Sequence, residues 1–209
     1  MLPYSSQRNI LRKRVITMST SQPLKNKEDI QKLKNYFYRK KEYRNYPLIT
    51  VGLNTALRIS DILYLKWKDV YQEEQQNFYS HIYVKEQKTQ KNTIILLNAA
   101  VKDALLLYKE SLKLYEAEHY IFCGQKGNEK PISRVQAFRI IKDAVTDLGL
   151  GEQISCHSLR KTFGYQAWKA GTEPALLMTI FNHSSYDITK RYLCIDQDDK
   201  DQLFSKINL

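Results

Sequence analysis

Two short stretches in the last third of the sequence combine histidines with basic side chains or hydroxyl groups. HSLR at 157–160 places His157 and Arg160 three residues apart, so on a helix the two side chains share a face and can bind one anion together. HSSYDITKRY at 183–192 adds His183 and two tyrosine hydroxyls, at Tyr186 and Tyr192, which are potential nucleophiles. Taken singly, each fits a plainer role, because most surface pairs contribute little and most tyrosines pack with a polar tip.

Basic residues also stand at two places nearer the N-terminus. Arg58 lies among apolar residues in ALRISDILYLKW, with Asp61 three positions on, and this pattern fits a structural ion pair equally well. Lys88 and Lys91 lie in KEQKTQK, between two segments with strand-like alternation. Lysines beside a turn are ordinarily solvated charges that protect a sheet edge. Neither place identifies a site by itself.

The elements that must position these residues follow from hydrophobic periodicity. A period of two in FYSHIYV and NTIILLN predicts a β-hairpin over 78–98, with DVYQ at 69–72 as a third strand. Apolar spacing and capping residues predict helices over 27–41, 47–57, 99–115, 134–148, 158–170 and 174–181. They also predict a short helix capped by Ser60, a helix capped by Ser185 that carries Tyr192, and a last helix in the C-terminal tail. The expected fold class is α+β, a mostly helical domain with a small three-stranded antiparallel sheet.

Positive charge is concentrated at the start of the chain. The net charge is +11, and residues 1–46 carry 12 Lys/Arg against 3 Asp/Glu, which indicates a polyanionic partner. Residues 1–24 show no periodicity, so we expect a flexible basic arm there and one domain over 25–209. The chain has no long apolar run and no secretory signal, which predicts a cytoplasmic protein without membrane contact. Three scattered cysteines predict neither disulfides nor a zinc site.

Taken in order along the chain, these stretches resemble the tyrosine recombinase (phage integrase) family. The matching segments are NTALRISDILYLKWKDV, KEQKTQKNTIILL, HSLRKTFGYQAWKAG and FNHSSYDITKRY. The family pattern is an arginine followed by a hydroxyl residue and an acid, a hairpin lysine, His-x-x-Arg, a further His or Trp, and a tyrosine beyond it. The resemblance implies the catalytic fold of that family and a site-specific DNA recombinase or integrase that acts through a 3′-phosphotyrosyl intermediate.

The resemblance also assigns roles to the residues. Tyr192 matches the nucleophile, nine residues after His183, whereas Tyr186 points about 120° away on a helix. Two arginines suit the charge that develops on nonbridging phosphate oxygens, a histidine can accept the tyrosine proton, and a lysine can protonate the leaving oxygen. The implied catalytic residues are Arg58 and Arg160 for charge, His157 as the base, Lys88 as the acid, His183 as a phosphate donor and Tyr192. Asp61 is a supporting residue, and no metal or other cofactor is expected.

The implied partner is double-stranded DNA. DNA contacts are expected from Arg12, Lys13, Arg14, Lys91 and Lys161. The resemblance further implies a homo-multimer on DNA, possible accessory DNA-bending proteins and a nucleoid-associated location. Family members usually carry a helical DNA-clamping domain before the catalytic one, and here only some 25 residues precede the match. Three interpretations stay open: a truncated chain, a naturally short member, or a member whose basic arm compensates in part through phosphate contacts.

Three positions outside the proposed catalytic residues depart from the family pattern, and two alternatives stay open for other reasons, the first of them because the clamping domain is missing. Ala56 and Asn182 replace frequent glycines, and Lys161 stands where a second histidine is frequent. One alternative is a catalytically silent DNA-binding relative that acts as a regulator. The other is a metal nuclease, for which DQDD at 196–199 is the only dense set of carboxylates, although acids also suit the start of a helix.

Overall fold

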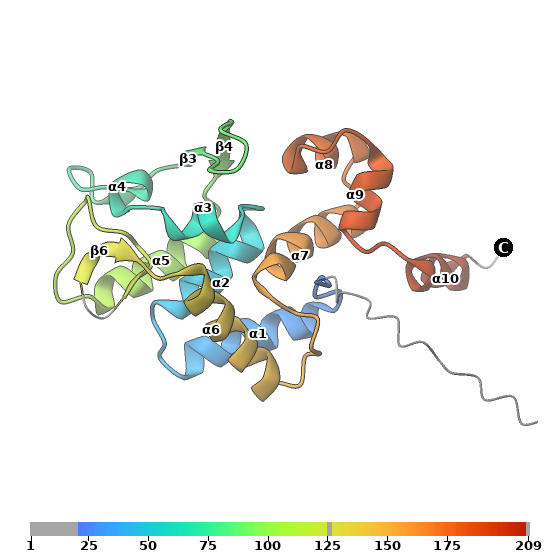
Figure 1. Ribbon diagram of the computed structural model, residues 1–209, viewed down its shortest axis with the longest axis horizontal. Coiled ribbons are helices and arrows are strands. Elements are labelled where there is room, and N and C mark those ends of the chain that lie inside the picture. Colours follow the sequence, from blue (N-terminus) through green and yellow to red (C-terminus); the bar gives the residue numbers. More distant parts are fainter. Residues whose placement is uncertain (1–20, 125–126, 208–209) are drawn as a thin grey trace, which may run out of the picture.

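Helices dominate the computed structural model, which describes residues 21–124 and 127–207 (Figure 1). The helices are α1 (Lys27–Arg39), α2 (Asn45–Asn54), α3 (Ile59–Leu63), α4 (Trp67–Val70), α5 (Ala99–Ser111), α6 (Arg134–Asp147), α7 (Cys156–Lys169), α8 (Pro174–Phe181), α9 (Tyr186–Tyr192) and α10 (Gln197–Lys206). The predicted helices are therefore present, with three differences at their starts. Helix α2 begins at Asn45, two residues before Pro47, and α7 begins at Cys156, two residues before the predicted start. Arg58 rather than Ser60 is the N-cap of α3.

Helix α2 lies at the centre of the packing. Its sequence NYPLITVGLN is apolar on nearly every side, as expected for a helix enclosed by others, and α1, α5 and α7 all pack against it. Gly52 marks the contact with α7, because a Cβ there would lie 2.6 Å from Leu159 Cδ1. The missing side chain lets the two helix backbones approach closely, and this contact sets the position of α7.

The strands form three separate two-stranded antiparallel ladders among the described residues, so the predicted three-stranded sheet is wrong in detail. β1 (Tyr71–Gln72) pairs with β2 (Asn77–Phe78), β3 (His81–Lys85) with β4 (Asn92–Leu96), and β5 (Cys123–Gly124) with β6 (Gly127–Pro131). Of the expected third strand at 69–72, the first two residues belong to helix α4. The other two form β1, which turns back onto β2 and does not join the β3–β4 hairpin. A turn this early leaves β1 too short to extend a second ladder.

The β3–β4 hairpin confirms the period-two prediction. In β3, Ile82 and Val84 are buried, whereas Tyr83 between them is 76% exposed. The inner face packs on the main hydrophobic cluster around Trp67, and the loop between the strands carries the predicted lysines. The hairpin therefore holds a basic loop at the edge of the helical body.

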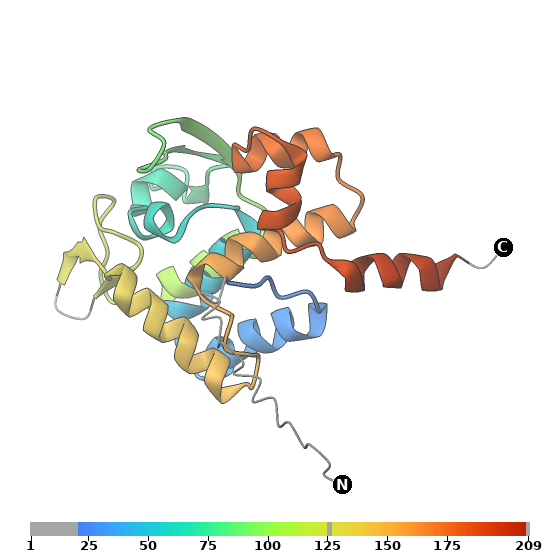
Figure 2. The ribbon, with the colours of Figure 1, turned by 45° about the vertical axis from the view of Figure 1, so that its right-hand side comes forward.

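Helices α8 and α9 form a separate unit against the C-terminal part of α7 (Figure 2). Gly164 on α7 permits this contact, since a Cβ there would lie 2.5 Å from both Leu193 Cδ2 and Phe181 Cζ. Leu177, Phe181 and Leu193 are buried in the small cluster that results. Helix α10 follows and projects away from the body, and Asp196 and Asp199 form the capping box that the DQDD motif predicted as a helix start.

The predicted boundary between arm and domain falls too late. Residues 1–20, with Arg12, Lys13 and Arg14, lie outside the described residues. Residues 21–24 pack on the domain instead of belonging to an arm: the Gln22 backbone N–H donates to the Gln153 carbonyl at 3.0 Å, and buried Leu24 donates to Thr162 Oγ1 at 2.8 Å. Within the described part of the chain, no helix is long and apolar enough to cross a membrane.

Candidate active site

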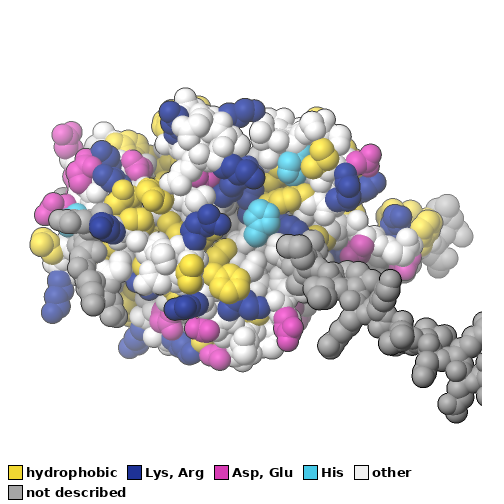
Figure 3. All heavy atoms as spheres, viewed as in Figure 1, with side chains coloured by type: hydrophobic (Ala, Val, Ile, Leu, Met, Phe, Trp, Pro, Cys, Tyr) yellow, Lys and Arg dark blue, Asp and Glu magenta, His cyan; other side chains and the backbone are white. Residues whose placement is uncertain are grey.

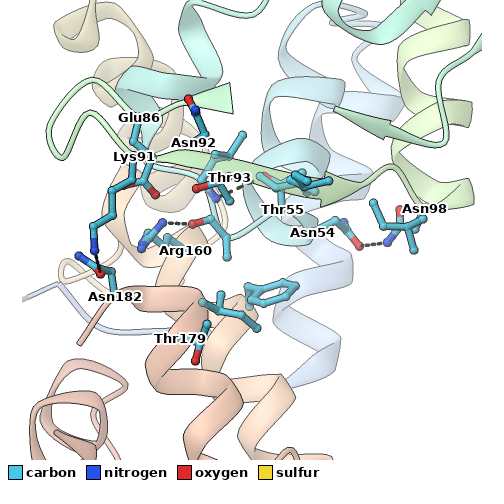
Figure 4. A pocket seen from close by; sticks show the side chains of 17 residues that line it. Asn54, Thr55, Glu86, Lys91, Asn92, Thr93, Asn98, Arg160, Thr179 and Asn182 are labelled. Atoms are coloured by element: carbon cyan, nitrogen blue, oxygen red, sulfur yellow. Dashed lines mark hydrogen bonds between the residues drawn. The ribbon is translucent and has the colours of Figure 1, made fainter. Parts of the chain in front are cut away.

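Helix α7 brings His157 and Arg160 onto one face, as the sequence predicted. Ser155 caps the helix in a box with Ser158, so that His157 lies in the first turn and Arg160 one turn further. Arg160 is only 4% exposed, and its Nη1 donates to the carbonyl of Ala56 (Figure 4). Ala56 has a left-handed backbone with φ 55°, which turns this carbonyl towards the guanidinium. The remaining donors of Arg160 are available to an anion.

Arg58 enters the same region from the start of α3. Its Nη1 forms an ion pair with Glu86 Oε2 at 2.6 Å. The sequence spacing had suggested Asp61 as the partner of Arg58 instead. Burial raises the pKa of Glu86, but hydrogen bonds from Thr89 and Arg58 outweigh it, so the pKa lies below its ordinary value. Glu86 is thus a site residue that the sequence did not single out. It lies at the end of the hairpin strand, where no spacing rule points to it.

Asp61 supports the hairpin loop and not an arginine. Its Oδ1 accepts the Gln87 backbone N–H at 3.0 Å, directly before Lys88, and its buried Oδ2 has no hydrogen-bond partner among the described residues. Lys88 itself is exposed and makes no hydrogen bond or ion pair within the described chain. Its charge contributes, as the smallest of the four cationic influences, to the lowered pKa of His157.

Tyr192 lies at the end of α9, enclosed by aromatic rings. Its ring centroid is 5.2 Å from His157, 5.0 Å from His183 and 5.2 Å from Phe181. The hydroxyl oxygen is buried and makes no hydrogen bond of ordinary geometry in the described structure. Burial raises the pKa of Tyr192, while the nearby charges of Arg160 and Arg58 oppose that rise. The hydroxyl is therefore buried beside the Arg160 and Arg58 cations, and Arg160 is the charged neighbour that acts on it most strongly.

The two histidines are held in different ways. His183 follows α8, with Nδ1 3.1 Å from Thr189 Oγ1 on α9, so that its Nε2 is the ring nitrogen left for a ligand. The His157 ring remains partly exposed, yet desolvation and the positive charges of Lys161 and Arg160 lower its pKa to about 4. His157 is consequently neutral at physiological pH and can accept a proton.

Tyr186 stays apart from this arrangement. It is the first residue of α9, six residues before Tyr192, and its ring contacts neither histidine. The structure thus brings together five of the six predicted catalytic side chains, whereas Lys88 is an exposed residue of the hairpin loop. Figure 3 shows basic side chains and histidines gathered on this face, where the hairpin, α7 and α9 meet.

The remaining basic candidates occupy unlike positions. Lys91 is exposed and donates from the hairpin to Asn182 Oδ1, across a groove of about 690 Å³ between the hairpin and α8 (Figure 4). Lys161 is only 6% exposed and donates to the Ser21 carbonyl at 2.6 Å, a position that differs from that of a surface DNA contact. No group of His, Cys, Asp or Glu in the described residues has a metal-binding arrangement.

Solved structures place this fold among site-specific recombinases. The crystal structure of XerA recombinase matches with a TM-score of 0.71 and 20% identity, covering 90% of this chain and 64% of that one. XerH recombinase bound to palindromic difH substrate, a post-cleavage complex, matches with a TM-score of 0.66 and 22% identity, covering 88% of this chain and 53% of XerH. These similarities establish the catalytic-domain fold, and this chain spans less than two thirds of either protein.

Sequence comparison gives the family. The phage integrase family matches residues 25–198, and a "Probable integrase/recombinase YoeC" of Bacillus subtilis (strain 168) is 41% identical over 181 residues, 87% of this chain and 93% of YoeC. The chain belongs to the phage integrase family and is a tyrosine-type recombinase, as its motifs predicted. The alternative of a silent regulator is not favoured, because YoeC, XerA and XerH are all named as recombinases.

Proposed function

We propose that this protein cuts and rejoins strands of double-stranded DNA through a covalent bond between Tyr192 and a 3′-phosphate. The observation that carries the proposal is the buried Tyr192 hydroxyl, which makes no hydrogen bond of ordinary geometry within the described residues and lies beside Arg160, Arg58 and two histidine rings. A buried polar group without a well-formed hydrogen bond ordinarily costs free energy, and a catalytic role is one physical reason to keep it. A scissile phosphate would supply the missing partner.

The reaction balances with the groups present. The Tyr192 oxygen attacks phosphorus, its proton passes to neutral His157, and the bond from phosphorus to the 5′ oxygen breaks as Lys88 donates a proton to that oxygen. Arg58 and Arg160 stabilise the added charge on the nonbridging oxygens with charge-assisted hydrogen bonds, and His183 donates a further one. Reversal with a 5′ hydroxyl as the nucleophile rejoins the strand and releases Tyr192.

Cleavage is expected in cis. Tyr192 approaches the histidines and arginines of its own chain, and Gly164 lets its helix pack directly on α7. Each subunit therefore attacks the phosphate that its own arginines hold. This arrangement differs from one in which a neighbouring copy donates the nucleophile.

Assembly on DNA is proposed to use helix α10. Its start is fixed to the body, since Asp199 accepts from the Tyr165 hydroxyl and pairs with Lys25 at 2.9 Å. Its apolar stripe is uncovered, with Leu203 60%, Phe204 74% and Ile207 59% exposed. An exposed apolar stripe on a projecting helix suits a contact with a second copy on DNA. Intracellular action beside DNA, with accessory bending proteins, completes the proposal.

A covalent-trapping experiment tests the proposed function. DNA duplexes selected from a randomised pool by binding to the protein are nicked near the inferred cleavage position, so that the cut fragment diffuses away and the adduct accumulates. The reaction runs in excess EDTA, and a denaturing gel should show a covalent protein–DNA band. Tight binding without any band would contradict the proposal and favour a silent DNA-binding protein, whereas cleavage that requires added magnesium would indicate a nuclease.

A further inference from the structure

Lys161 has surroundings that the proposed chemistry leaves unexplained. It directly follows Arg160 on α7 and is only 6% exposed. Its Nζ donates to the Ser21 carbonyl at 2.6 Å and lies 3.5 Å from Cys194 Sγ. Within residues 21–124 and 127–207, no carboxylate forms an ion pair with it. Buried lysines are rare without a paired acid, so this ammonium needs a reason to be where it is.

The same ammonium contacts the nucleophile. Its Nζ is 5.3 Å from the centroid of the Tyr192 ring, a distance at which a cation is attracted to an aromatic face. Cys194, two residues further, has φ 56° and ends the turn that follows α9. Lys161 therefore contacts the ring and the segment just after it, while the Ser21 carbonyl fixes the ammonium from the other side.

We propose that Lys161 is a positioning residue, whose buried ammonium, held by the Ser21 carbonyl, keeps the Tyr192 ring against His157 for proton transfer. The inference rests on the proposed function and deepens it. Lys161 contacts neither the scissile phosphate nor the transferred proton, and so acts through Tyr192 and His157. The resemblance led us to expect that Lys161 contacts DNA. In this inference Lys161 instead orders the nucleophile.

The charge of Lys161 supports this role. Four positive groups act on His157: Lys161 and Arg160 from α7, Arg58 from the start of α3, and Lys88 from the hairpin loop. From α9 the ring faces the Tyr192 side chain. After desolvation, Lys161 is the largest influence that lowers the pKa of His157, to about 4. Removing this charge should raise that pKa and protonate the base at a higher pH.

The test compares Lys161→Met with Lys161→Gln, Lys161→Arg and a matched control, Lys169→Met, which removes an exposed lysine from the same helix. Three quantities are measured: the rate of covalent adduct formation on the trapped duplex as a function of pH, DNA affinity, and the nuclear Overhauser effect between the Tyr192 and His157 rings in the free protein.

For Lys161→Met we expect a rate loss on the order of 100-fold, as small misplacements of reacting groups produce, with DNA affinity retained. The acidic limb of its pH profile should move up towards the ordinary histidine value of 6.5. Arginine should restore most of the rate, and Lys169→Met should behave as wild type.

The outcomes separate this inference from the proposed function. If wild type forms no adduct, the proposed function fails, and loss of the ring-to-ring Overhauser effect in Lys161→Met would still support positioning. If an uncharged variant folds and reacts at the wild-type rate with an unchanged pH profile, the inference is overturned. If both uncharged variants lose cooperative unfolding, Lys161 serves the fold alone, and the inference is again overturned.

Discussion

Adding a single methyl group at Gly164 should disturb the nucleophile from a distance. An alanine Cβ there would lie 2.5 Å from Leu193 Cδ2 and from Phe181 Cζ, whose side chains are 0% and 1% exposed and have no free space to move into. Overpacking of this kind costs roughly 1–3 kcal/mol, and the helix propensity gained from alanine returns about 1 kcal/mol. With the contact this short, we expect the upper end, a net loss of about 2 kcal/mol. Because Leu193 adjoins Tyr192, the shift should also slow cleavage, by on the order of 100-fold.

Denaturant unfolding and adduct formation by the same Gly164→Ala preparation measure the two effects. Ile141→Val is the matched control, since it destabilises the buried cluster under α6 by roughly 0.5–1.5 kcal/mol, away from the site. The control should lose stability while it cleaves at nearly the wild-type rate. A Gly164→Ala protein that gains about 1 kcal/mol, as an ordinary helical glycine would on substitution, and that cleaves normally would refute the close packing of α9 on α7.

Three further predictions concern the arm, the direction of attack and assembly. Deleting residues 1–17 should reduce the slope of log K against log salt by up to about 0.9 per lost phosphate contact, and an unchanged slope would show that the arm does not contact DNA. Mixing Arg160→Ala with Tyr192→Phe should yield no covalent product, whereas attack in trans would restore it. Phe204→Ser should weaken the multimer on DNA in native gels and leave single-site binding intact; Leu114→Ser, at another exposed apolar residue, is the control and should change neither.

The sequence predicted the helical elements well, because long apolar periodicities and caps are local signals. The short elements failed for the same reason. The two-residue strand β1 has too few residues to show a period, and its partner was decided by the turn that follows it. The β5–β6 pair, within residues 123–131, was missed because it is short and its sequence is largely polar.

The site could be predicted in its residue types but not in its internal contacts. The spacing of His157, Arg160, His183 and Tyr192 carries the family pattern, and the structure brings these four together. Pairings across the fold have no sequence signal: Arg58 selects Glu86, which is 28 residues away, and Asp61 binds the hairpin backbone. Lys161 could not be placed from sequence either, because its burial depends on Ser21, 140 residues earlier.

The structure gives a physical explanation for two of the departures from the family pattern. Ala56 and Asn182, which replace frequent glycines, both have φ 55°, where glycine is favoured. Asparagine tolerates this region better than most residues, and here its side chain also accepts a hydrogen bond from Lys91. Ala56 orients the carbonyl that Arg160 contacts. Both positions thus adopt a backbone conformation that favours glycine, without a glycine.

Identifying the residue that becomes covalently attached to DNA is the most direct test of the proposed chemistry. After the covalent adduct is trapped and the DNA is digested to a short remnant, trypsin separates the two candidate tyrosines: Tyr186 falls in the peptide 170–190, and Tyr192 in the peptide 192–200 or, if cleavage after Arg191 is blocked, 191–200. Tandem mass spectrometry should find the nucleotide remnant on Tyr192 alone, and Tyr192→Phe should abolish it. A remnant on Tyr186, or an adduct that survives Tyr192→Phe, would contradict the assignment of Tyr192 as the nucleophile.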